Sequence, residues 1–197
     1  MSAKLGKIHY WLFDQIKIID DRNQFLLKNN SKLKNKYDYT LKNVSLEEAL
    51  DGNHIHPGLE SLIVKVQNLE SKIVIDLLKE ESVEKLKNKY FEHGKMIAKQ
   101  KAQKSSNLIE AANSLKDIFL ERMPCDRLSK IKNLDNEVQI IRQDKLHTEF
   151  WKSSKDKMHL LYSKWIKGAL SIINSDIEHK RKLYEEEYID YLKFKED

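Results

Sequence analysis

The sequence predicts an all-α fold: one domain spanning residues 1–197, built as a single bundle of about six or seven helices. The chain contains only five glycines and two prolines, which leaves little material for the turns of β-hairpins. Apolar residues recur at intervals of three, four and seven along most of the chain, the spacing of one buried helix face. Side chains that cap helices precede several of these segments.

The first helix is expected from about Lys4 to Asn29. Its principal apolar stripe consists of Leu5, Ile8, Leu12, Ile16, Ile19 and Leu26. A second stripe at heptad spacing consists of Trp11, Ile18 and Phe25, and indicates that this helix contacts partners on two sides. We therefore expect the first helix near the centre of the bundle.

A short helix and a long one are expected next. Ser45 and Glu48 match a capping box, which opens a helix by satisfying exposed amide groups. That helix must be short because residues 51–53, Asp-Gly-Asn, are typical of a turn. Pro57 fits the first position of the following helix, where its missing amide hydrogen costs nothing. An amphipathic stripe then predicts a helix as far as about residue 79.

Two arrangements fit residues 82–122. Ser82 is expected to cap a helix that turns Gly94 toward its buried side, where the lack of a side chain lets another backbone approach closely. The phase of the apolar residues permits one long helix over the whole segment. Because residues 105–107 offer caps and Lys101 would fall on the buried face, we favour a break there.

The remainder of the chain is also expected to be helical. We predict a short helix within residues 126–136, a helix over residues 138–152, and another that starts at residues 153–156. Ser175 and Glu178 match a capping box for a last helix. A stripe of this last helix carries Tyr184, Tyr188 and Tyr191, which indicates a half-solvated seam. A homodimer formed through that seam is one alternative for the role of the protein.

Charge and hydropathy argue against several partners. The 36 basic and 31 acidic residues leave a net charge of +5, and only five of the basic residues are arginines, the side chain on which nucleic-acid readers depend. The lysines of residues 85–104 spread around their helix, which is typical of a solvated face. No stretch approaches the roughly 18 apolar residues of a membrane span, and the amino terminus has no secretory pattern. With a single cysteine, we expect a cytoplasmic protein that binds neither membrane nor nucleic acid.

The segment Met123-Pro124-Cys125-Asp126 is the first candidate for a functional site, because it holds the only cysteine and one of the two prolines of the chain. Three alternatives stay open for Cys125. A buried thiol would act as a small, inert hydrophobic group. An accessible thiol would contact a ligand or a metal ion. A nucleophilic thiolate would need a neighbouring histidine, lysine or helix amino terminus, and no Cys-His-Asn pattern accompanies it.

The histidines give only partial metal patterns. Pairs with Asp-x-x-His spacing are Asp144/His147, Asp156/His159 and Asp176/His179. Di-iron bundles use the longer glutamate at this spacing, so we do not predict a di-iron site. In an extended loop, His54 and His56 would point the same way and could share one zinc or nickel ion, given further ligands. The alternative is that His56 caps the next helix and His54 is exposed.

Other histidines face apolar sides of predicted helices. His9 and His93 occupy such positions, where a histidine is usually a core residue hydrogen-bonded to a neighbour, although both could also line an internal cavity. His147 and Trp151 are four residues apart, so they would stack on one helix face and could close that cavity.

Three short patches of the chain resemble a family of small, uncharacterised, all-helical bacterial proteins. They are Gly6-Lys7-Ile8-His9-Tyr10-Trp11-Leu12, Met123-Pro124-Cys125-Asp126 and His147-x-x-x-Trp151. The resemblance implies a helical bacterial protein and no particular activity or substrate. It groups His9, Cys125, Asp126 and Trp151 as parts of one site.

These observations favour a non-catalytic protein that binds or senses a small molecule or a metal ion. The expected ligand-binding residues are His9, His54, His56, Cys125, Asp126 and Trp151. The sequence identifies no cofactor. The alternatives are a thiol- or histidine-dependent enzyme and a helical protein that acts by dimerisation.

Overall fold

The computed structural model describes residues 5–196, without the side chains of Pro124, Thr148 and Ser153, and these residues form eight α-helices and one four-stranded antiparallel sheet. The helices are α1 (Lys7–Leu27), α2 (Ser31–Lys36), α3 (Leu46–Leu50), α4 (Ile55–Leu77), α5 (Val83–Lys101), α6 (Leu108–Ile118), α7 (Thr148–Trp151) and α8 (Lys155–Ile173). The strands are β1 (Ser129–Asn133), β2 (Val138–Gln143), β3 (Ile177–Leu183) and β4 (Glu187–Phe194). The prediction of an all-α bundle of six or seven helices is therefore wrong.

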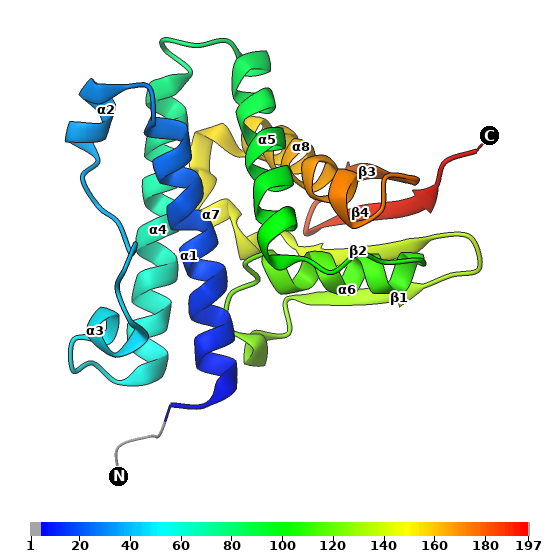
Figure 1. Cartoon of the computed structure of the whole chain (residues 1–197), viewed down its shortest axis with the longest axis horizontal. Coiled ribbons are helices and arrows are strands. Elements are labelled where there is room, and N and C mark those ends of the chain that lie inside the picture. The colour runs from blue at the N-terminus through cyan, green and yellow to red at the C-terminus, as the bar shows by residue number, and fades with distance from the viewer. Residues whose placement is uncertain (1–4, 197) are drawn as a thin grey trace.

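The long helices of the amino-terminal half follow the apolar pattern. In α1 the predicted stripe is buried from Leu12 to Leu26, whereas Ile8 is exposed and Lys4 lies outside the described residues. This helix packs along α4 and also contacts α5 (Figure 1). No described helix is both long enough and apolar enough to cross a membrane.

Helix starts agree well with the capping patterns. The capping box of α3 forms as expected, because the Ser45 Oγ accepts from the Glu48 amide at 3.2 Å and the Glu48 carboxylate accepts from the Ser45 amide at 2.8 Å. Helix α4 begins at Ile55, so Pro57 occupies its third position rather than its first. The predicted break after α5 is confirmed: α5 ends at Lys101, and the Asn107 side chain caps α6.

Two glycines bring α5 and α8 into backbone contact. A Cβ atom added to Gly94 would lie 2.1 Å from the carbonyl oxygen of Trp165, and one added to Gly168 would lie 2.0 Å from the carbonyl oxygen of Phe91. No side chain larger than hydrogen fits at these distances. The expectation that another backbone approaches Gly94 is confirmed.

The main correction concerns the carboxy-terminal third. Residues 126–136 and 138–152 were expected to be helical, but they form the hairpin β1–β2 followed by short helical turns and α7. The predicted last helix is the hairpin β3–β4, and the Ser175–Glu178 pattern caps no helix. The strand order is β1-β2-β4-β3, so β2 and β4 pair the two hairpins side by side. Helices α6 and α8 contact this sheet and cover one of its faces (Figure 1).

The side chains on the covered face explain why the strands were missed. In β2, Val138, Ile140 and Arg142 are buried, which is the alternation of a half-buried strand. In β4, however, Asp190 and the apolar Ile189 beside it are both buried, which obscures the period of two. The spacing of Tyr184, Tyr188 and Tyr191 and the Ser175–Glu178 pattern predicted a helix instead, although Tyr188 is buried in β4 and Tyr184 lies in the turn before that strand.

The inward charges neutralise one another. Asp190 accepts hydrogen bonds from Arg142 at 2.6 Å, from Arg181 at 2.8 Å and from the ring of His179 at 2.6 Å. Arg142 also donates to Glu121 at 2.8 Å. Burial acts to raise the pKa of Asp190, but Arg181 and His179 outweigh it and hold that pKa well below its usual range. The buried carboxylate therefore stays charged and joins β2, β3 and β4.

A second buried polar network lies among the helices. The Arg22 Nε of α1 donates to Glu70 of α4 at 2.6 Å, and its Nη2 donates to the Tyr162 hydroxyl of α8 at 2.7 Å. The hydroxyls of Tyr90 and Tyr162 in turn donate to Glu70 at 2.8 and 2.6 Å. One ion pair thus connects α1, α4, α5 and α8, and each of its buried polar groups has a partner.

Candidate functional site

An open groove lies where the start of α4 meets the Cys125 segment. We call it the thiol groove, and its lining residues are His56, Pro57, Glu60, Arg122, Met123, Cys125, Asp126, Leu128 and Lys145. It encloses about 580 Å³, within the usual range of small-molecule sites of roughly 300–1,000 Å³. Three of the predicted site residues, His56, Cys125 and Asp126, lie along it.

The loop that carries the thiol has an unusual backbone. Residues 124–126 form a single turn of 3₁₀ helix; Arg122, two positions before it, and Arg127, directly after it, have φ angles of +36° and +50°. Non-glycine residues in this left-handed region cost about 1–2 kcal/mol each. Arg122 forms ion pairs with Glu60 at 3.2 Å and with Glu149, which attaches the loop to α4 and α7. These contacts hold the strained loop in place.

Cys125 is exposed, so the buried-thiol alternative does not apply. Among the described residues its sulfur has one hydrogen-bond partner, the Asp126 carboxylate at 3.9 Å. No histidine lies within hydrogen-bond distance of it. Nowhere in residues 5–196 is a group of three or more described His, Cys, Asp or Glu side chains placed to hold a metal ion. In the described part of the chain, the Cys125 thiol is therefore not hydrogen-bonded to a histidine and belongs to no group of three metal-ligating side chains.

The other predicted histidines lie close to the groove or outside it. The ring of His9 is 5.6 Å from that of His56, measured between centroids, and its Nδ1 accepts from the Gly6 amide at 2.9 Å. His54 is the N-cap residue of α4 and is exposed, but its side chain caps nothing. His56 is exposed and does not cap the helix either. The structure thus places His9 behind His56 and leaves His54 out of the groove.

Trp151 lies elsewhere, in a buried group that we call the histidine cluster: His147, Trp151, His159 and Tyr188. His147 and Trp151 stack at 4.8 Å between ring centroids, as their spacing predicted. His159 meets the edges of Trp151 at 4.9 Å and of Tyr188 at 5.0 Å. The stack faces the core rather than the thiol groove, so Trp151 contributes no wall to it.

The cluster is polar but uncharged at neutral pH. Burial lowers the pKa of His147 well below its usual value. Burial, helped by the Arg181 guanidinium, lowers the pKa of His159 to about 4, although Asp144 opposes this. Among the described residues, the His147 Nε2, Trp151 Nε1, His159 Nε2 and Tyr188 hydroxyl have no hydrogen-bond partner. Buried polar atoms of this kind are generally completed by ordered water.

Several groove residues gave little signal in the sequence. Arg122 and Glu60 are far apart in the chain, and only the fold joins them across the groove. Arg122 directly precedes the Met123–Asp126 segment, which is the one feature that could have marked it. Lys145 reaches the groove from the turn after β2, a segment that was predicted to be helical.

Comparisons with known proteins add no relative. No family model, no curated protein and no solved structure matches the chain. The resemblance carried by the three short patches therefore remains an expectation, and the function must be argued from the geometry.

Proposed function

We propose that the protein binds a small polar molecule in the thiol groove and does not transform it. The observation that carries this proposal is the convergence of a thiol, an imidazole and charged groups on one open groove, presented by a strained loop. Strained backbone of this kind is often retained at binding and catalytic sites. The cavity volume of about 580 Å³ suits a ligand of modest size.

Each lining residue has a distinct role in this proposal. Cys125 supplies a polarisable contact, and His56 supplies a hydrogen-bond donor and acceptor. Lys145 provides a positive charge for an anionic group of the ligand. The largely buried Met123 and Leu128 form the apolar floor of the groove. The Arg122 ion pair with Glu60 fixes the distance between the two sides of the groove.

Binding is favoured over thiol catalysis because, among the described residues, the Cys125 thiol has no close hydrogen bond to a base. A catalytic nucleophile normally has a base within about 2.6–3.2 Å, and it is oriented by that contact. Among the described residues, the hydrogen-bond partner of the Cys125 sulfur is instead the Asp126 carboxylate, at the longer distance of 3.9 Å. The alternative of a thiol-dependent enzyme predicts alkylation by iodoacetamide at neutral pH far faster than that of a free thiol.

The single cysteine permits a selective test. A fragment library is screened against the wild-type protein by ligand-observed NMR, and the hits are measured again after Cys125 has been alkylated with iodoacetamide. Alkylation places a carbamidomethyl group at the position of the thiol, so we expect hits that contact Cys125 to lose binding. The Cys125→Ser variant is the matched control: it has no thiol to alkylate, so iodoacetamide should not change its affinity for the hits, although loss of the sulfur contact should itself weaken them. Fragments that bind the alkylated protein as well as the untreated one would refute this site.

A further inference from the structure

A second pocket lies between α1, α5 and the connection from α2 to α3. It has a volume of about 330 Å³ and is lined by residues of the ranges 17–24, 40–43 and 97–101. We call it the Asp20 pocket. It shares no lining residue with the thiol groove.

The key group is a buried carboxylate on the pocket wall. Asp20 is 3% exposed, and its Oδ2 accepts from the Leu41 amide at 2.7 Å and from the Thr40 hydroxyl at 3.0 Å. Its Oδ1 has no hydrogen-bond partner among the described residues. Leaving such a group unpaired costs about 1–3 kcal/mol. Desolvation accordingly raises the pKa of Asp20. A donor that reaches this buried Oδ1 would remove that cost.

A second carboxylate stands beside it. Asp21 lies on the pocket wall, with its Oδ2 3.1 Å from the Nε2 of His93. Trp165 donates from its indole nitrogen to the Nδ1 of His93 at 2.8 Å, so the hydrogen of the neutral ring is on Nε2 and points to Asp21. The contact with His93 orients Asp21, whose side chain is 54% exposed. Asp20 and Asp21 are consecutive residues of α1, and the charge of Asp21 adds to the rise that burial causes in the pKa of Asp20, so a positively charged group is favoured near them.

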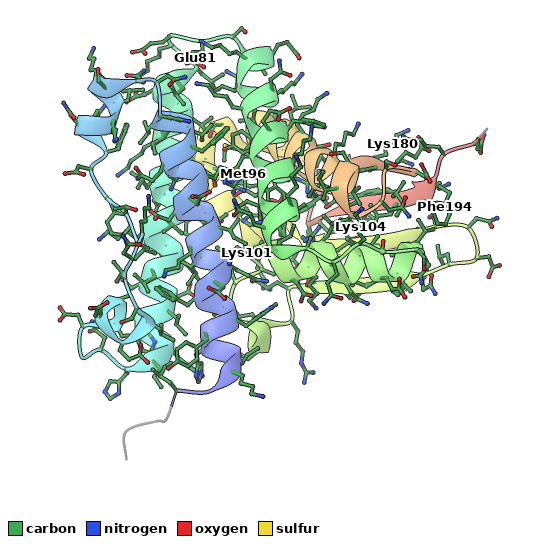
Figure 2. All side chains as sticks on the ribbon, viewed as in Figure 1. Glu81, Met96, Lys101, Lys104, Lys180 and Phe194 are labelled. Carbon is green, nitrogen blue, oxygen red and sulfur yellow. The ribbon has the colours of Figure 1, made fainter. Side chains whose placement is uncertain are left out.

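Lysines also line the pocket, and one of them, Lys17, is close enough to Asp20 to act against the rise in its pKa. Lys17, Lys42 and Lys101 all line it. Lys101, at the end of α5 (Figure 2), lies 4.0 Å from Asp14 of α1, and Lys42 is exposed with no ion pair in the described part of the chain. These ammonium groups suit a carboxylate of the ligand.

The remaining lining is apolar. Ile18, Leu41 and Ile97 are buried and line the pocket from its three segments. An aliphatic group bound there would be removed from water, which stabilises binding by roughly 25 cal/mol per Å² of apolar surface. Negative, positive and apolar regions therefore adjoin in one pocket.

We propose that the Asp20 pocket binds an aliphatic amino acid. The ligand ammonium donates to Asp20 and Asp21, its carboxylate pairs with Lys42 and Lys101, and its side chain packs on the apolar lining. The inference stands apart from the thiol groove, because neither site contributes a residue to the other.

The test uses L-leucine as the probe, titrated into the isotope-labelled full chain and followed by amide chemical shifts. Isoamylamine, which lacks the carboxylate, and 4-methylpentanoate, which lacks the amine, are titrated in parallel. We expect shifts confined to residues 17–24, 40–43 and 97–101, and tighter binding of leucine than of either analogue. Asp20→Asn should weaken leucine at least about tenfold, as expected for loss of a charge-assisted hydrogen bond.

Because Asp20 also holds the 40–43 segment, a variant outside that contact is needed. Lys101→Ala should weaken the binding of leucine and of 4-methylpentanoate but not that of isoamylamine. Lys99 is exposed on the same helix and lies outside the pocket, so Lys99→Ala should leave the binding of all three unchanged. Absence of shifts at millimolar leucine overturns the inference, as do shifts located elsewhere. Equal effects of Lys101→Ala and Lys99→Ala overturn it as well.

Discussion

Acidification should destabilise the fold through its buried histidines, and His159 allows the effect to be calculated. Its pKa falls from an ordinary 6.5 to about 4 in the folded protein, because the ring is buried and faces Arg181. Below pH 6.5 the unfolded chain therefore binds a proton that the folded chain does not, so stability falls as the pH falls. The two pKa values give a loss of about 2 kcal/mol between pH 7.5 and pH 5.

The perturbation that isolates this effect is His159→Gln. Urea denaturation of the wild type and the variant at pH 7.5 and pH 5 gives the free energy of unfolding in each state. The substitution changes the free energy of unfolding at pH 7.5 by an amount that does not matter here. Between pH 7.5 and pH 5, the free energy of unfolding should fall by about 2 kcal/mol less in the variant than in the wild type. Leu160→Gln, at the exposed neighbouring position, is the control and should follow the wild type. Equal acid losses in His159→Gln and the wild type would refute the reasoning.

Three further outcomes are expected. Gly94→Ala forces α5 away from the Trp165 carbonyl and should destabilise the protein by about 1–3 kcal/mol despite the better helix propensity of alanine, and a higher melting temperature would contradict the close contact. Arg22→Met leaves Glu70 buried without its ion pair and should cost about 3–5 kcal/mol, whereas adding Glu70→Leu should recover part of the loss in the same denaturation assay. Cys125→Ser should change stability by less than about 0.5 kcal/mol, since the thiol is exposed, and a large shift in melting temperature would show that it is packed.

The long helices of the amino-terminal two thirds of the fold could be predicted from the sequence because they bury simple apolar stripes, whereas α2, in a polar and lysine-rich segment that looks like a surface connection, could not. Local capping chemistry was equally informative, as the Ser45–Glu48 box and the Asn107 cap show. The sheet could not be predicted in this way. Its inward face carries Arg142 and Asp190, whose burial depends on each other and on residues from other strands. Hydrophobic periodicity treats every charged residue as exposed, so it cannot predict the burial of a charge that is neutralised by a residue distant in the sequence.

The candidate site was accessible to sequence reasoning only in part. The rarity of cysteine and proline marked the Cys125 segment, and the start of α4 brings His56 to the same groove. The spacing of His147 and Trp151 predicted their stacking but not the direction in which the pair faces. Asp20 was hidden because an aspartate in an amphipathic helix looks solvated, and only the packing of residues 40–41 over it shows otherwise.

The ionic centre of the sheet also restricts how its strands can align. Sliding β4 by one residue along β2 would turn Asp190 outward to water and swing Tyr191 or Ile189 inward. Arg142 would then lose Asp190, one of its two buried counter-ions, and keep only Glu121, which destabilises the slipped alignment. A purely hydrophobic face would tolerate such a slip far better. The buried charges thus favour one register of β4 on β2, and with it one alignment of the two hairpins.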